Sequence, residues 1–246
     1  MHVRGPELFF ITQAQHHRPH GWGHLVMSRH NEIATNLNLV KDRIAAAASK
    51  SGRSVGEITL IAVTKTFPAS DVEILKTLGV TDFGENRDSD GAGKAITVSG
   101  TWHFQGQIQS NKLKSITSWA HVIHSLDDMK HFEIIERVAA HPLDIFCQVS
   151  LDGAEGRGGV QQEKLYELAQ AIQTSSHHHL VGLMAVAPLG MSSASAFEML
   201  AKIHQSFIRD FPEANKLSAG MSGDFEEAIA YGATHIRVGS SILGSR

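Results

Sequence analysis

Lys65 is the first residue whose position could support chemistry. It directly follows the apolar run ITLIAVT, residues 58–64, which is typical of a strand buried on both faces. A lysine at a strand tip commonly extends its ammonium into solvent, and the run alone favours this simple interpretation. The alternative is a desolvated amine with a lowered pKa, which can attack a carbonyl carbon.

Two turns rich in glycine and serine could hold an anion. Ser222 lies in SAGMSGD, directly before a predicted helix, and Gly239 and Ser240 lie in RVGSSILG. Backbone amides, hydroxyls and the dipole of a following helix suit a phosphate group. Each turn alone is a weak signal, because glycine and serine also form ordinary tight connections.

The elements that would position these residues alternate along the chain. Apolar residues at spacings of three and four predict an opening helix over residues 31–50. Eight apolar runs then alternate with helix-compatible stretches: ITLIAVT, VTDFGE, TWHFQG, HVIHSL, DIFCQVSL, LVGLMAVA, KLSAGM and HIRVGSS. This α/β pattern predicts a single (β/α)8 TIM-type barrel with an extra N-terminal helix, and a doubly wound open sheet is the main alternative.

The barrel would bring the three groups of residues together. Active sites on this fold lie at the carboxyl ends of the strands, and phosphate commonly binds after the seventh and eighth strands. Lys65 follows the first predicted strand, Ser222 the seventh and Ser240 the eighth. We therefore expect one site that combines a lysine with two anion-binding turns.

Length and composition indicate one globular domain. The 246 residues are 42% hydrophobic and 19% charged with a formal net charge of -3, which argues against disorder and against nucleic acid as a partner. No apolar run approaches the roughly 20 residues that span a bilayer, so no membrane association is expected. Residues 1–28 lack periodicity and are expected to be a loosely ordered leader, with Met27 as a second start, before a barrel over residues 29–246.

The cysteine and histidine residues bear on the cellular compartment and on metal binding. Cys147 is the sole cysteine, which excludes an internal disulfide and fits the cytoplasm. The chain has 16 histidines, including the triplet at residues 177–179. Adjacent side chains converge poorly on one ion, so we expect no metal site.

Six motifs in fixed order support a family assignment. They are AVTKTFP, FGEN, WHFQGQIQSNK, GLM, LSAGMSGDFEEAI and RVGSSILG, and they extend over about residues 31 to 244. The chain resembles the pyridoxal phosphate homeostasis protein family, whose members are single-domain barrels similar to the N-terminal domain of alanine racemases. The resemblance implies that pyridoxal 5'-phosphate (PLP) is the cofactor.

The resemblance also implies how PLP is held. Lys65 would form a Schiff base with the cofactor, Asn86 would line one side of the ring, and Arg237 would approach the pyridine nitrogen. Because arginine is a permanent cation, that nitrogen would stay unprotonated and the ring would be a weak electron sink.

The same resemblance assigns the phosphate to Ser222, Gly239 and Ser240. The chain departs from the family pattern at Arg87, Gln107 and Gly223, whereas the residues assigned directly to the cofactor are retained.

Three functions are compatible with these residues. The leading hypothesis is a carrier that buffers PLP, maintains vitamin B6 and amino-acid homeostasis, and has no catalytic residue. The alternatives are a PLP-dependent amino-acid racemase and a class I Schiff-base aldolase. Racemases of this fold add a tyrosine from a separate β domain, which is not expected here, and Tyr166 and Tyr231 lie in predicted helices away from the mouth. We expect a monomer that meets PLP-dependent client enzymes only transiently.

Overall fold

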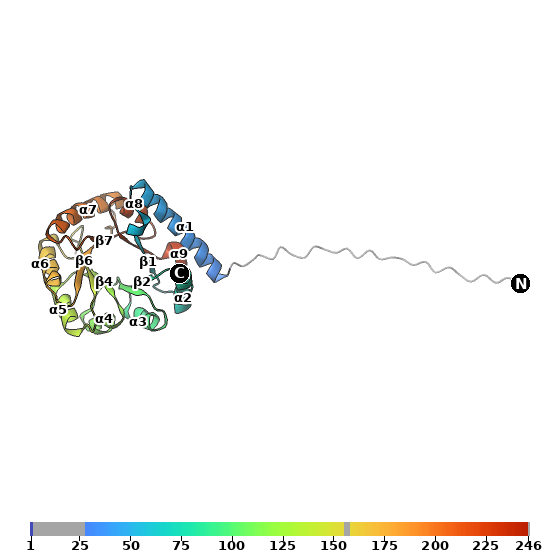
Figure 1. Cartoon of the computed structure of the whole chain (residues 1–246), viewed down its shortest axis with the longest axis horizontal. Helices are drawn as coiled ribbons and strands as arrows, with labels where there is room; N and C mark the ends of the chain where they lie inside the picture. Colours follow the sequence, from blue (N-terminus) through green and yellow to red (C-terminus); the bar gives the residue numbers. More distant parts are fainter. Residues whose placement is uncertain (2–27, 155–157, 246) are drawn as a thin grey trace.

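The computed structural model describes Met1, residues 28–154 and residues 158–245. Most of the expected leader, including Met27, lies outside the described residues. Figure 1 shows a ring of helices around a central set of strands. The prediction of a single barrel with an extra N-terminal helix is confirmed.

Eight parallel strands close into a barrel in sequence order, and β1 pairs with β8. Each strand is short, and each coincides with a predicted apolar run. The strands are β1 (Thr59–Val63), β2 (Asp82–Glu85), β3 (Thr101–Phe104), β4 (Val122–Leu126), β5 (Asp144–Gln148), β6 (His179–Met184), β7 (Lys216–Ser218) and β8 (His235–Val238).

Helices cover the outside of the barrel (Figure 1). They are α1 (Arg29–Lys50), α2 (Ala69–Thr77), α3 (Asp88–Thr97), α4 (Leu113–Trp119), α5 (Met129–Val138), α6 (Gln162–Gln173), α7 (Ser193–Asp210), α8 (Phe225–Ala230) and α9 (Ser240–Leu243), with short 3-10 turns at Val55–Glu57 and Ser110–Lys112. Helix α1 starts two residues before the predicted position, because Ser28 caps it by accepting a hydrogen bond from the Asn31 amide. It packs against α8 and α9.

The strands bury side chains on both faces. Alternate residues of β4 and β5, such as Ile123 and Ile145, belong to the main core between strands and helices. The residues between them point the other way, so that Val122 and Phe146 form a second cluster with Met184 inside the barrel. The barrel interior is therefore partly apolar, and polar groups that lie there need hydrogen-bond partners.

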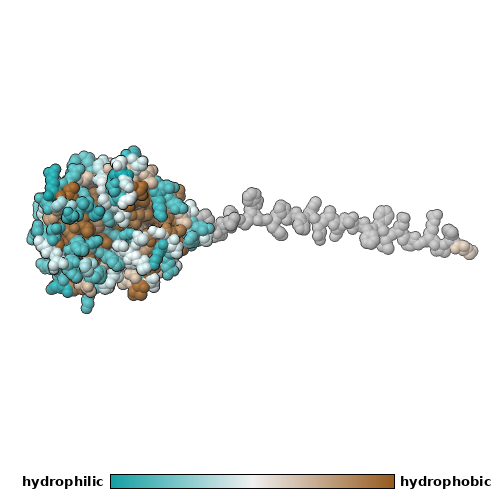
Figure 2. All heavy atoms as spheres, viewed as in Figure 1, coloured by the Kyte–Doolittle hydropathy of each residue, from teal (hydrophilic) through white to brown (hydrophobic). Residues whose placement is uncertain are grey.

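The surface is mixed in character. Figure 2 shows hydrophilic residues over most of the visible face, with several hydrophobic patches between them. Within the described part of the chain, no helix combines the length and apolar character that crossing a membrane requires.

Candidate functional site

A cavity of about 300 Å³ lies at the carboxyl ends of the strands. It is bordered by the ends of β1, β6 and β8 and by the segments after β2, β3 and β7. All six residues expected to contact the cofactor line it, namely Lys65, Asn86, Ser222, Arg237, Gly239 and Ser240. The barrel thus brings together residues that are up to 175 positions apart (240 − 65).

Lys65 sits on a strained turn at the edge of this cavity. The next residue, Thr66, has a φ of 70°, a left-handed conformation that is unusual for a β-branched side chain. The Phe67 amide donates to the Thr64 carbonyl at 3.1 Å and closes the turn. Lys65 is exposed to solvent, as the apolar run alone favoured, and the alternative of a desolvated amine is not found. The barrel rim is open at this position, and its apolar strand ends before the lysine.

A buried ion pair lies directly behind Lys65 and Asn86. Lys94 Nζ lies 2.5 Å from Glu85 Oε1 and donates to the Thr64 carbonyl at 2.7 Å. The Thr64 hydroxyl donates to the same Glu85 oxygen at 2.6 Å. Because Thr64 and Glu85 immediately precede Lys65 and Asn86, this cluster joins the two strand ends that carry the site residues.

Asn86 is half-buried, and a close backbone contact supports it. A Cβ atom added at Gly106 would lie 1.9 Å from the Asn86 carbonyl oxygen. Glycine therefore allows the segment after β3 to pack directly on the segment after β2.

The two glycine and serine turns are joined to each other. Ser222 Oγ accepts hydrogen bonds from the amides of Gly239 and Ser241, both at 3.3 Å. The Ser241 hydroxyl donates back to the Ser222 carbonyl at 3.3 Å. The helices that follow, α8 and α9, have only 6 and 4 residues, so their dipoles are smaller than the sequence suggested. Hydroxyls and amides are the groups that this region offers to an anion.

Arg237 is anchored in the floor of the cavity with 6% of its surface exposed. One terminal nitrogen donates to Ser218 Oγ at 2.7 Å and the other to the Ala185 carbonyl at 3.1 Å. Burial lowers the pKa of Arg237 to about 10, so the side chain remains a cation at neutral pH. Its direct partners are neutral, which leaves its charge available to a ligand in the cavity.

Sequence reasoning missed several residues at this site. Gln105, Met184 and Met221 also line the cavity, although no chemical signature marks them. Lys94 and Ser218 do not line the cavity but bind Thr64 and Arg237 from behind. The signal that could have indicated Ser218 is a polar residue inside an apolar run, as in KLSAGM. Of the departures from the family pattern, Gly223 lines the cavity itself. Arg87 and Gln107 line a neighbouring hollow of about 340 Å³ that shares Asn86.

The histidine triplet takes part in structural contacts. The Leu143 amide donates to His178 Nδ1 at 3.2 Å, and His179 Nδ1 lies 3.0 Å from Asp144 Oδ1. Among residues 28–154 and 158–245, no group of three or more histidine, cysteine or acidic side chains is arranged to hold a metal ion.

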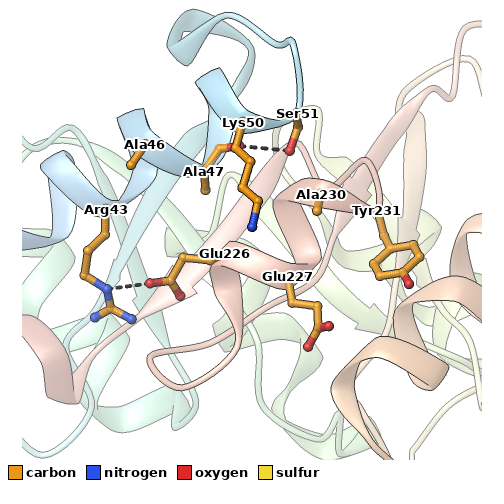
Figure 3. Close-up of a pocket in the computed structure, with 9 residues that line it drawn as sticks. All are labelled: Arg43, Ala46, Ala47, Lys50, Ser51, Glu226, Glu227, Ala230 and Tyr231. Atoms are coloured by element: carbon orange, nitrogen blue, oxygen red, sulfur yellow. Dashed lines mark hydrogen bonds and ion pairs between the residues drawn. The ribbon is translucent and has the colours of Figure 1, made fainter.

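A larger groove of about 800 Å³ lies between α1 and α8 on the outside of the barrel. Figure 3 shows its ion pair between Arg43 and Glu226, with Lys50, Glu227 and Tyr231 along the same walls. The groove is open, its charges of both signs are balanced, and it contains none of the six predicted site residues. The smaller cavity at the strand ends is therefore the candidate site.

Comparison with known proteins identifies the family of this chain. Residues 35–246 match the family described as "Alanine racemase, N-terminal domain". The pyridoxal phosphate homeostasis protein of Mycobacterium leprae is 38% identical over 240 residues, which cover 88% of this chain and 93% of that protein. This chain belongs to the pyridoxal phosphate homeostasis protein family. The resemblance inferred from the six motifs is confirmed.

Solved structures extend the comparison for this member of the pyridoxal phosphate homeostasis protein family. PipY of Synechococcus elongatus, solved with PLP bound, has a TM-score of 0.72 at 28% identity and covers 86% of this chain and 100% of its own. Alanine racemase of Corynebacterium glutamicum has a TM-score of 0.67 at 13% identity, covering 87% of this chain and 60% of its own. The second similarity shows a shared fold alone.

Proposed function

We propose that this chain binds PLP in the cavity at the strand ends, carries and buffers it, and so maintains vitamin B6 and amino-acid homeostasis without significant turnover. The observation that carries the proposal is the convergence of all six predicted contacts on one cavity. The name of the Mycobacterium leprae relative and the PLP bound to PipY support it.

Lys65 supplies the covalent attachment in this proposal. Its Nζ atom would hold PLP covalently by condensing with the aldehyde of the cofactor, with water as the leaving group. The exposed position of Lys65 lets the aldehyde reach the amine from solvent. The ion pair behind the lysine keeps its strand end fixed next to Asn86.

The remaining contacts hold the two ends of the cofactor. Ser222, Gly239 and Ser240 would hold the phosphate, because hydroxyls and amides satisfy its oxygens. The Arg237 cation would hold the ring nitrogen unprotonated, and the bound ring would then be a weak acceptor of electrons.

Among the residues that the structure describes, the cavity lining lacks the groups that a racemase or an aldolase would require. Of the described residues that line it, Lys65 and Arg237 are the two with titratable side chains. Both reactions need a further acid or base next to the reacting carbon. Tyr166 packs against Phe207 and Phe211, and Tyr231 lies in the groove between α1 and α8 (Figure 3). A carrier is the function that fits best.

The proposal extends to partners and location. PLP is the small-molecule partner, and PLP-dependent enzymes are transient clients that receive it. We propose a cytoplasmic monomer that does not bind nucleic acid or membranes, in keeping with its composition and net charge of -3.

Reduction of the loaded protein with borohydride, followed by peptide mass mapping, tests this function. We expect visible absorbance from bound PLP and a single reduced adduct on Lys65. Lys65→Ala should abolish the adduct and keep the fold, because the side chain is exposed, whereas Lys50→Ala in the α1–α8 groove should behave as wild type. An adduct mapped to Lys50 or Lys112 would overturn the proposal.

A further inference from the structure

A line of hydrogen bonds crosses the barrel interior and ends at Arg237. Arg237 donates to Ser218 Oγ at 2.7 Å, and Ser218 Oγ lies 2.9 Å from His124 Nδ1. His124 Nε2 then lies 2.8 Å from His103 Nδ1. The line finishes where His103 Nε2 meets Asp82 Oδ1 at 3.0 Å.

The line connects five strands through the interior and ends at Asp82, which is partly exposed. Its members lie on β8, β7, β4, β3 and β2, and the contact between Ser218 and His124 joins strands that are not neighbours in the sheet. Ser218 and His124 are fully buried, and His103 is nearly so. His124 also stacks on Phe146, with 4.5 Å between the ring centroids. Buried polar groups of this kind are costly unless each finds a partner, and here each does.

The two ends of the line fix its direction. An arginine only donates, so Ser218 Oγ accepts at that end. At the other end, burial alone would raise the pKa of Asp82, but hydrogen bonds from His103 and Thr81 outweigh it and hold that pKa below its ordinary value. Asp82 is therefore an ionised carboxylate that only accepts, and His103 Nε2 carries a proton.

The histidine tautomers follow when each imidazole in the line donates one hydrogen bond and accepts one. This arrangement adds no second cation to an interior that already holds Arg237. The His103 Nδ1 atom then accepts from His124 Nε2, which leaves His124 Nδ1 to accept from the Ser218 hydroxyl. Burial, with the positive charge of Arg237 nearby, holds the pKa of His124 well below its ordinary value, which keeps this ring neutral as well.

We propose that Ser218, His124, His103 and Asp82 are positioning residues that hold the Arg237 guanidinium in the cavity floor through hydrogen bonds donated in one direction. The carboxylate at the far end orders the two imidazoles, these orient the Ser218 hydroxyl, and its oxygen presents lone pairs to Arg237. The part of this inference that concerns the PLP ring nitrogen rests on the proposed function, whereas the order of the hydrogen bonds does not.

Nitrogen NMR of histidine-labelled protein without added PLP tests the order directly. We expect both His103 and His124 to be neutral with the proton on Nε2 at pH 7. In Ser218→Ala the His124 Nδ1 atom loses its donor and its nitrogen resonance shifts, while Ser218→Thr keeps the hydroxyl and the wild-type signal. Thr117→Val, which removes an equally buried hydroxyl in α4, is the matched control and should leave the histidine resonances unchanged.

A second measurement reads the effect on Arg237. The affinity for PLP is compared with that for an analogue in which a C–H group replaces the ring nitrogen. We expect wild type and Ser218→Thr to prefer PLP by about tenfold, the value of one hydrogen bond to a charged donor, and Ser218→Ala to lose most of that preference.

The outcomes separate the two proposals. A doubly protonated His103, or a proton on His124 Nδ1, would overturn the inferred order whether or not PLP binds. An unchanged preference for PLP in Ser218→Ala would overturn the positioning role. Expected tautomers in a protein that binds no PLP would support the order of the hydrogen bonds and overturn the proposed function.

Discussion

Lys94 and Glu85 form a buried ion pair immediately behind the two strand ends that carry the site lysine and asparagine. One Glu85 oxygen receives both the Lys94 ammonium and the Thr64 hydroxyl. The other, Oε2, is buried and has no hydrogen-bond partner among the described residues. The carboxylate thus depends on Lys94 for its charge balance, since burying an unpaired charge is costly.

We predict that Lys94→Met strongly destabilises the fold. The substitution keeps the length of the side chain but leaves the Glu85 charge unpaired, which costs about 3 to 5 kcal/mol in the free energy of unfolding. Urea unfolding measures it. Adding Glu85→Leu to Lys94→Met should recover most of the loss, because both charges are then absent.

The matched control for that prediction is Lys202→Met. Lys202 pairs with Glu198 at 2.7 Å on the exposed surface of α7, where an ion pair contributes less than about 1 kcal/mol. Equal losses in the Lys94 and Lys202 variants would contradict a special role for the buried pair.

Replacing Ser222 and Ser240 together with alanine should weaken PLP far more than unphosphorylated pyridoxal. Each hydrogen bond to the phosphate is expected to contribute about 1.5 to 3 kcal/mol, and pyridoxal does not make these bonds. Titration of each ligand into wild type and the double variant provides the measurement. Similar losses for both ligands would mean that the serines only hold the two turns together, as the contacts from Ser222 to Gly239 and Ser241 already do.

The fold should lose stability on mild acidification. Burial, with nearby positive charge, lowers the pKa of His235 from 6.5 to about 4. As the pH falls, His235 takes up a proton at a higher pH in the unfolded chain than in the folded protein. The stabilisation that comes from a neutral His235 is therefore complete above pH 6.5 and is lost as the pH falls towards 4. Between pH 7 and 5 the loss from His235 alone is about 2 kcal/mol, and the buried His124 acts in the same direction.

Urea midpoints at the two pH values check this prediction. His235→Gln should reduce the pH dependence, whereas the substitution His177→Gln on an exposed loop should leave it as in wild type. An unchanged pH dependence in His235→Gln would contradict the assignment.

The barrel and the gathering of the site residues were predictable from local patterns. Each apolar run is followed by a helix-compatible stretch, and that alternation allows few topologies. Once a barrel is assumed, Lys65 after β1 and Asn86 after β2 must be neighbours, because the carboxyl ends of parallel strands share one edge.

The groups behind the site were not predictable in the same way. His124 and Ser218 are 94 residues apart on strands that do not pair, so their contact depends on the barrel diameter and register. Lys94 reaches Glu85 from a helix face whose orientation no sequence pattern specifies. The exposure of Lys65 depends on how far the surrounding loops extend past the rim, and the apolar run before the lysine carries no information about that.

The last prediction is that the protein does not racemise alanine at an enzymatic rate. Inversion requires an acid or base on each face of the substrate carbon, and a correctly placed partner typically contributes about 10² to 10⁴ in rate. Lys65 can serve one face, and Arg237 is the other titratable side chain among the described cavity residues. As a cation near the ring nitrogen, Arg237 would also make the ring a weak acceptor of electrons. Incubation of PLP-loaded protein with L-alanine in heavy water, read by chiral chromatography and by deuterium at the α-carbon, should show at most slow exchange without inversion. Several turnovers per minute that disappear in Lys65→Ala would instead establish a racemase.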